Sequence, residues 1–119
     1  MNLVELFSNY NIIKEEWMAE SISFSWDAGK NVINQNKHTV SFEEAVSVFY
    51  DEEAIVISDD EHSIDEDRFV IIGTSSKLRV LVVCHCYRKN DEEIRIISAR
   101  KAKSRERMQY EESIKRRQQ

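Results

Sequence analysis

Four runs rich in branched apolar residues follow one another between residues 54 and 99, and they restrict the possible folds more than any other feature. The runs cover residues 54–57, 69–72, 80–87 and 94–99. Valine and isoleucine at this density favour β-strands. Strands joined by short links usually pair with their neighbours along the chain. We therefore predict an α+β fold in which helices pack against a small antiparallel or mixed sheet of about four to five strands.

The first half of the chain carries helical patterns around one short strand. Apolar residues recur at helical spacing over residues 3–17, and residues 22–26 alternate apolar and polar side chains as a half-buried strand does. Asp27 can cap a polar helix that runs to about Lys37. A capping-box pattern at residues 41–44 then begins a short helix with an apolar face, in which the glutamate is expected to reach back to the first residue.

The length of 119 residues suits one domain with a hydrophobic core. We predict an N-terminal helical extension over residues 1–20 and a single domain over residues 21–119. No run of about 18 apolar residues is present, so the sequence predicts no membrane span and a cytoplasmic location. The two cysteines of the chain flank His85 within an apolar run and would point to the opposite face of a strand from it. This geometry argues against a metal site, and no cofactor is expected.

Charge is strongly segregated along the chain. Residues 1–67 hold sixteen acids and three lysines, a net charge of −13, whereas residues 95–117 hold nine cations and three acids, a net charge of +6. The whole chain carries −5. This balance argues against indiscriminate wrapping of nucleic acid, but a local basic surface can still bind phosphate. The basic residues that we predict to bind the phosphates of a nucleic acid are Lys37, Lys101, Lys103 and Arg105.

The sequence motifs of several common enzyme classes are missing. The chain contains no glycine-rich phosphate loop, no Gly-x-Ser-x-Gly motif, no Cys-x-x-Cys pair and no HExxH motif. Cations and imidazoles remain, without an obvious nucleophile. This inventory suits RNA cleavage, because RNA supplies its own nucleophile in the 2′-hydroxyl group. The protein then needs only a base, an acid and hydrogen-bond donors for the charged phosphorane.

Five residues are candidates for this chemistry. His38 and His85 are candidate acid and base groups, because an unperturbed imidazole titrates near neutral pH. Arg95 and Arg100 are candidate phosphate ligands, since a guanidinium offers paired donors in a fixed fork. Arg68 begins a strand and can reach the same end of the sheet. The strand order decides which of these side chains meet.

These candidates also have structural interpretations. A histidine within an apolar strand, such as His85, is more often a hydrogen-bonded structural group. Arg95 follows Glu93 closely and can pair with a carboxylate. His62 lies among acids and is interpreted as a solvated loop residue. The acidic segment 58–67 is interpreted as a solvated loop in preference to a contact for a basic partner.

Three blocks of the sequence form a more specific pattern. They are residues 24–45, which contain FSWDAGKN and KHTVSFEEA, residues 67–73, DRFVIIG, and residues 94–112, which begin with IRIISARK. In order and spacing, these blocks resemble the BrnT family of bacterial toxin-antitoxin toxins. The residues that match functional positions of the family are Lys37, His38, Arg68, His85, Arg95, Arg100 and Tyr110.

The resemblance implies a RelE-like fold and an endoribonuclease that needs no metal and arrests growth by blocking translation. It also implies a cognate antitoxin, BrnA, which inhibits the toxin and carries a ribbon-helix-helix element. The toxin would then reach operator DNA only through the antitoxin. The resemblance further implies that the residues at the matching family positions belong to the functional site and that Tyr110 contacts RNA. A rival hypothesis is a non-catalytic module that acts only as the partner and co-repressor of a DNA-binding antitoxin.

Three features of the chain depart from the family pattern. Thr39 stands where the family usually has glycine, and a β-branched residue is strained there if the position requires a positive φ. Lys103 replaces the usual threonine of a capping box that ends at Glu106, so we predict that the last helix begins at Ser104 without that hydroxyl. The first twenty or so residues lie outside the resemblance.

Overall fold

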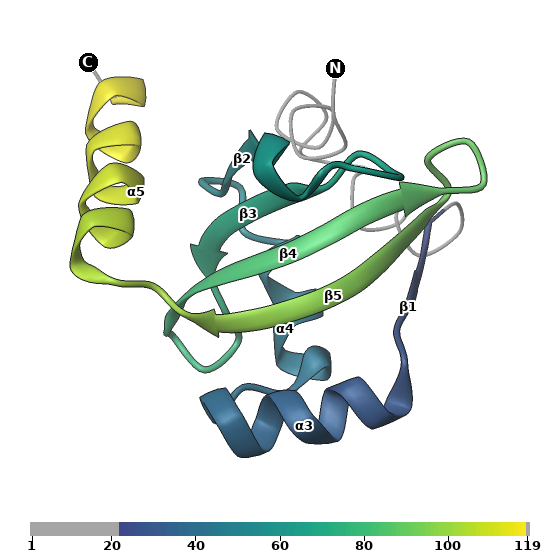
Figure 1. Ribbon diagram of the computed structural model, residues 1–119. Helices are drawn as coiled ribbons and strands as arrows, with labels where there is room; N and C mark the ends of the chain where they lie inside the picture. Colours follow the sequence, from purple (N-terminus) through teal and green to yellow (C-terminus); the bar gives the residue numbers. More distant parts are fainter. Residues whose placement is uncertain (1–21, 119) are drawn as a thin grey trace.

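The computed structural model describes residues 22–118, so the predicted helix at residues 3–17 and the extension at residues 1–20 lie outside the described residues. One short strand comes first, and two helices, four strands and a final helix follow it (Figure 1). Their bounds are β1 (Ser23–Ser25), α3 (Ala28–His38), α4 (Phe42–Val48), β2 (Ile55–Ser58), the 3₁₀ turn η1 (Asp60–His62), β3 (Phe69–Thr74), β4 (Val80–Arg88), β5 (Glu93–Lys101) and α5 (Ser104–Arg117).

The five strands form one mixed sheet in the order β1-β5-β4-β3-β2. The pairs β2–β3, β3–β4 and β4–β5 are antiparallel, whereas β1 runs parallel to the start of β5. The predicted α+β fold with a small mixed sheet is therefore confirmed. All four predicted apolar runs form strands, because the hairpin links between them leave each run beside the next.

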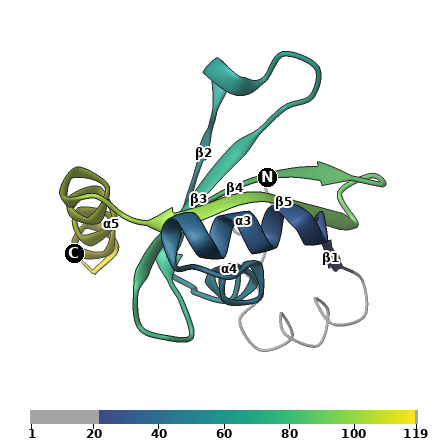
Figure 2. The same cartoon turned by 60° about the horizontal axis from the view of Figure 1, so that its bottom comes forward.

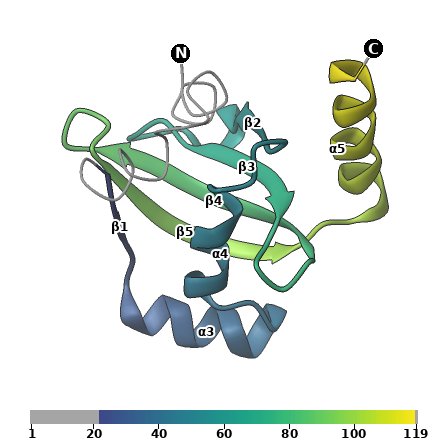
Figure 3. The same cartoon turned by 180° about the vertical axis from the view of Figure 1, so that it is seen from behind.

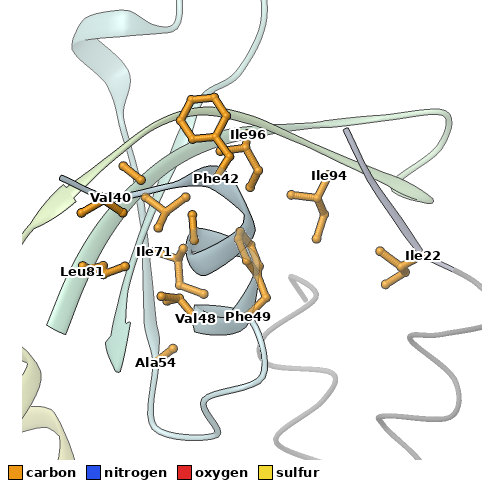
Figure 4. Close-up of a cluster of buried hydrophobic side chains, with 13 residues drawn as sticks. Ile22, Val40, Phe42, Val48, Phe49, Ala54, Ile71, Leu81, Ile94 and Ile96 are labelled. Carbon is orange, nitrogen blue, oxygen red and sulfur yellow. The ribbon is translucent and has the colours of Figure 1, made fainter. Parts of the chain in front are cut away.

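The main hydrophobic core lies on the face of the sheet that α4 covers (Figures 3 and 4). Phe42 and Val48 of α4 are fully buried, and they pack over Ile71, Leu81 and neighbouring strand residues. Burial of such a side chain contributes about 1.5–3 kcal/mol to folding. The close approach leaves no room at Gly73, where an added Cβ would lie 2.9 Å from the Ala54 Cβ.

Polar side chains attach α3 to the free edge of β5. The Asn34 side chain donates to the carbonyl oxygen of Ala99 at 2.7 Å and accepts from the Ala99 N–H at 3.2 Å, as a neighbouring strand would. It also donates to the carbonyl oxygen of Val40. Although α3 is polar and mostly exposed, its buried asparagines satisfy backbone groups that would otherwise be unpaired. The C-terminal end of α3 therefore lies beside the C-terminal end of β5 (Figure 1).

The capping box at the start of α4 is only half formed. The Ser41 hydroxyl accepts from the Glu44 N–H at 3.0 Å, as predicted. The Glu44 side chain does not reach back to Ser41; it is buried and accepts hydrogen bonds from Arg79 and from the Ser75 hydroxyl. This part of the prediction is wrong because a half-buried arginine competes for the carboxylate. Arg79 also donates to the carbonyl oxygen of Thr39 at 3.0 Å.

A second, smaller hydrophobic cluster fixes α5 to the other face of the sheet. Tyr110 packs with Ile72 and Val82, and its hydroxyl donates to Asp51 Oδ2 at 2.5 Å. The hydroxyl also lies 3.0 Å from the Thr74 hydroxyl oxygen. The helix begins at Ser104, as predicted, and the Lys103 N–H donates to Glu106 Oε1 at 2.8 Å. The glutamate half of the family's capping box is therefore kept, while the lysine ammonium has no acceptor to offer.

One β-bulge determines which side chains of β5 share a face. Cys84 pairs with Ser98, but His85 pairs with Ile96, so Ile97 is an extra residue in β5. Strict alternation would put Arg95 and Arg100 on opposite faces, because they are five residues apart. With the extra residue, Arg95 lies opposite Cys86 and Arg100 opposite Val82, on the same face of β4. That face is the one that α4 does not cover.

The link between β2 and β3 projects from the sheet as an arm, made of residues 59–68 (Figure 2). It rises on the side away from α3 and α4. The predicted solvated loop is thus partly ordered, because η1 and several side-chain hydrogen bonds hold it. Among the helices of residues 22–118, none is long and apolar enough to cross a membrane.

Candidate functional site

Charged residues lie on the face of the sheet that α4 does not cover, which we call the open face; α5 packs only on the part of it around Ile72 and Val82. The register places Cys86 opposite Arg95 on one side, while on the other side the pairing of β3 with β4 ends at Phe69 and His85, one residue after Arg68. The Asp59 N–H donates to the carbonyl oxygen of Arg68 at 2.8 Å, at the base of the arm. We call Asp59, Arg68, Cys86 and Arg95 the row, because they lie at or next to this end of the paired strands.

Arg68 has a donor with no acceptor. Its Nε atom is buried and has no hydrogen-bond partner among the described residues. The charges of Asp59 and Arg68 both act on the Cys84 thiol, whose pKa is raised mainly by burial. Arg68 thus lies over the sheet and not out in solvent. A buried N–H without a partner costs free energy, and an anionic oxygen would remove that cost.

Arg95 is half-buried and forms no ion pair with any residue of the described part of the chain. The carboxylate of Glu93, its expected partner, instead accepts from the Ser25 hydroxyl at 3.0 Å and pairs with Lys89 at 3.1 Å. Two strand spacings of about 4.8 Å separate the backbones of Arg68 and Arg95, roughly 10 Å in all. A backbone phosphate between them is within reach of both long side chains.

Arg100 is held away from the row by its partner and by its place on the strand. Four residues of β4 separate the positions opposite Arg95 and Arg100, or about 14 Å. The Arg100 guanidinium donates to both oxygens of Glu106, each at 2.7 Å. This hydrogen bonding, together with the arginine charge, holds the pKa of Glu106 below its usual range. Glu106 occupies the fork that a phosphate would use, so phosphate binding by Arg100 requires its displacement.

The two predicted catalytic histidines lie in very different surroundings. His85 is 0% exposed and packs edge-on against Phe49, while Nδ1 and Nε2 lie 3.2 Å from the Val83 carbonyl oxygen and 3.0 Å from the Tyr87 hydroxyl. Burial lowers the pKa of His85 to about 4. This burial favours the structural interpretation of His85, and its catalytic role stays an untested prediction.

His38 is half-buried at the end of α3, and no hydrogen-bond partner of its ring is found in residues 22–118. It lies past Ala99 along β5, at the end of the sheet opposite the row. The next residue, Thr39, has φ 59°, so the family's glycine position does require the left-handed region. The strained turn is held by the Thr39 N–H bond to Gln35 and by the bond from Arg79.

Most of the residues predicted to contact RNA are exposed cations around this same end of the sheet. They are Lys37, Lys101, Lys103 and Arg105. Tyr110 differs, because it is only 5% exposed and its hydroxyl is bound to Asp51 and Thr74. Burial and the Asp51 carboxylate raise the pKa of Tyr110 to about 12. A ring in this position anchors α5 to the sheet, and the predicted contact of Tyr110 with RNA stays an untested prediction.

Sequence reasoning missed the pair formed by His62 and Asp59 on the arm. His62 Nδ1 lies 3.0 Å from both carboxylate oxygens of Asp59. The His62 side chain is 63% exposed, and Asp59 continues the row that contains Arg68. The sequence shows the spacing of three residues, but the surrounding acids favoured a solvated loop. The strand pairing that brings Asp59 to Arg68 cannot be read from the sequence.

The described residues also include no group of three or more histidine, cysteine, aspartate or glutamate side chains that could hold a metal ion. Burial is the main cause that raises the pKa of both cysteine thiols, and Cys86 lies near the Glu66 carboxylate. Neutral thiols are poor nucleophiles and poor metal ligands.

Comparison with known proteins identifies the family. A family model described as the ribonuclease toxin, BrnT, of type II toxin-antitoxin systems matches residues 26–106. The structure is similar to the crystal structure of the Brucella abortus ribonuclease toxin BrnT, with 25% sequence identity and a TM-score of 0.50, over 70% of this chain and 99% of that one. No curated protein matches the chain. The chain therefore belongs to the BrnT family of ribonuclease toxins of type II toxin-antitoxin systems.

Proposed function

We propose that this protein is a metal-independent endoribonuclease that binds single-stranded RNA on the open face, with a backbone phosphate between Arg68 and Arg95. The observation that carries this proposal is the buried Arg68 Nε, which has no acceptor among the described residues. Arg68 belongs to the same row as Arg95, which forms no ion pair with residues 22–118. Two guanidinium groups can neutralise the dianionic phosphorane that forms during cleavage. The attacking group is the 2′-hydroxyl of the RNA itself.

At the other end of β5, RNA would meet a second group of cations. Lys37, Lys101 and Arg105 are exposed there, and Arg100 becomes available when a phosphate displaces Glu106. The hypothesis that His38 transfers protons places the cleaved phosphate at this end. In that case His38→Ala should lower the cleavage rate by about 10² to 10⁴. An unchanged rate would place proton transfer elsewhere.

The cleavage chemistry is tested with an unstructured RNA in excess EDTA. The purified protein should cleave this RNA and leave 2′,3′-cyclic phosphate ends, because the 2′-oxygen displaces the 5′-oxygen. A matched RNA with 2′-O-methyl groups keeps the phosphates but lacks the attacking hydroxyl, so it should bind and remain intact. Cleavage that stops in EDTA, or that also occurs in the methylated RNA, would contradict the proposal.

As a type II toxin, the protein has an antitoxin partner. We propose a BrnA-like antitoxin with a ribbon-helix-helix element, through which the complex binds operator DNA. A ribonuclease toxin would arrest translation by cleaving RNA, whereas the rival hypothesis of a non-catalytic co-repressor predicts no such arrest. Expression without an antitoxin should stop growth and protein synthesis, and Arg95→Ala should relieve the arrest. Normal growth with abundant, folded wild-type protein would favour the co-repressor.

A further inference from the structure

We infer that His62 is the proton-transfer group of the ribonuclease site and that Asp59 positions it; this inference rests on the proposed function. The chain has three histidines. His85 is enclosed in the core, and His38 lies at the end of the sheet away from Arg68 and Arg95. His62 is the histidine that the fold attaches to the row containing both arginines.

The strand pairing brings His62 to this site. Asp59 and Arg68 are joined by a backbone hydrogen bond of 2.8 Å, and their side chains share the open face. His62 is one turn of η1 further along, with Nδ1 3.0 Å from the Asp59 carboxylate. The arm that carries the pair rises beside the open face (Figure 2). RNA bound at Arg68 therefore passes within reach of the imidazole.

The orientation of the ring suits a general base. A carboxylate next to Nδ1 favours the tautomer with the proton on Nδ1, which leaves the Nε2 lone pair free. The side chain is 63% exposed, so Nε2 is open to substrate. Exposed pairs of this kind contribute little to folding. The pair can therefore be removed with little effect on stability, and its loss should be seen in catalysis.

The step that we assign to His62 is transfer of the 2′-hydroxyl proton. The 2′-oxygen forms a bond to phosphorus while the bond from phosphorus to the 5′-oxygen breaks. The hydroxyl proton passes to His62 Nε2, the leaving 5′-oxygen takes a proton from water, and His62 returns its proton to the resulting hydroxide. The products are a 2′,3′-cyclic phosphate and a 5′-hydroxyl, so no oxidant, metal or further reactant is required.

The test compares His62→Ala with the wild-type protein, both at full length, using the EDTA assay. His62→Ala should lower kcat by about 10² to 10⁴ and leave KM and the affinity for 2′-O-methyl RNA unchanged. Added imidazole should restore part of its activity, because the free base can occupy the vacated space. It should not restore Arg95→Ala, which lacks a phosphate ligand. Asp59→Asn should lower kcat with an intact fold, and Asp59→Glu should recover part of the loss.

Each outcome decides the inference. Cleavage by His62→Ala at the wild-type rate overturns it, and so does a loss of activity that comes with weakened RNA binding and no response to imidazole. If the wild-type protein cleaves RNA, Arg95→Ala does not, and His62→Ala does, this inference alone fails. If the wild-type protein does not cleave RNA in EDTA, both this inference and the proposed function fail.

Discussion

His85 couples the protonation of one side chain to the stability of the fold. Burial lowers its folded-state pKa from 6.5 to about 4, because the charged ring would lose its water. The unfolded chain binds a proton near pH 6.5, whereas the folded protein binds it only near pH 4. The stabilising effect of the neutral ring is therefore complete above pH 6.5 and is lost as the pH falls from 6.5 towards 4.

This difference predicts a loss of about 2 kcal/mol in the free energy of unfolding between pH 7 and pH 5. Denaturant unfolding at the two pH values measures it. His85→Gln should be less stable at pH 7 but should show much less pH dependence, since an amide does not titrate in this range. His38→Gln is the matched control and should keep the dependence. An unchanged pH dependence in His85→Gln would show that another group causes it.

At the scale of elements, Arg79 joins the β3–β4 hairpin to the turn between α3 and α4. It binds the buried Glu44 carboxylate and the carbonyl oxygen of Thr39. Burial alone would raise the pKa of Glu44, but the hydrogen bonds from Arg79 and Ser75 and the arginine charge outweigh it, so the pKa lies below its usual range. The pair thus holds a charged group inside the protein at neutral pH.

Arg79→Ala should cost about 3 kcal/mol of folding stability, because it leaves the Glu44 charge buried and without its main partner. Lys77→Ala is the control: the Lys77 side chain is 67% exposed and its ammonium lies 4.0 Å from the same carboxylate, so its loss should cost less than about 1 kcal/mol. Thermal or denaturant unfolding compares the two. Equal effects of both changes would contradict the role given to the buried pair.

The contact of α5 with the sheet gives a second prediction at this scale. Tyr110→Phe removes the hydroxyl that binds Asp51 and Thr74, and should destabilise the protein by about 1–2 kcal/mol while leaving its affinity for RNA unchanged. Tyr50→Phe, at a ring that is 40% exposed, is the control for loss of a tyrosine hydroxyl. Reduced RNA affinity with unchanged stability would restore Tyr110 to the RNA-binding surface.

At the scale of the whole molecule, local patterns predicted the elements but not the site. The density of valine and isoleucine places the strands, and Asp27 and Ser41 mark the helix starts, because these preferences act within a few residues. Whether Arg68 and Arg95 lie near each other depends on pairing between strands that are far apart in sequence. The bulge at Ile97 decides whether Arg95 and Arg100 share a face. Only the adjacent isoleucines at 96 and 97, which break the alternation, hinted at it.

The strand pairing also determines where the acidic and basic segments of the chain lie in the structure. The acidic arm lies beside the row of arginines, as the Arg88–Glu66 pair at 3.7 Å shows, while the cations of α5 lie at the other end of the sheet. A negative arm next to a phosphate site repels RNA unless a specific contact compensates for it. In the function that we propose, Arg68 and Arg95 supply that contact, so these two residues should matter more than the larger number of exposed cations on α5.

The most direct test of this account is the rate of RNA cleavage in EDTA by Arg68→Ala, Arg95→Ala and Arg107→Ala, each shown by circular dichroism to be folded. Arg107 is an exposed cation on α5 that we do not assign to RNA binding, and it controls for the loss of one positive charge. We expect the first two variants to cleave at least about 10² times more slowly than the unmodified protein, and the third to cleave nearly as fast. Equal rates for all three variants would contradict a site at Arg68 and Arg95.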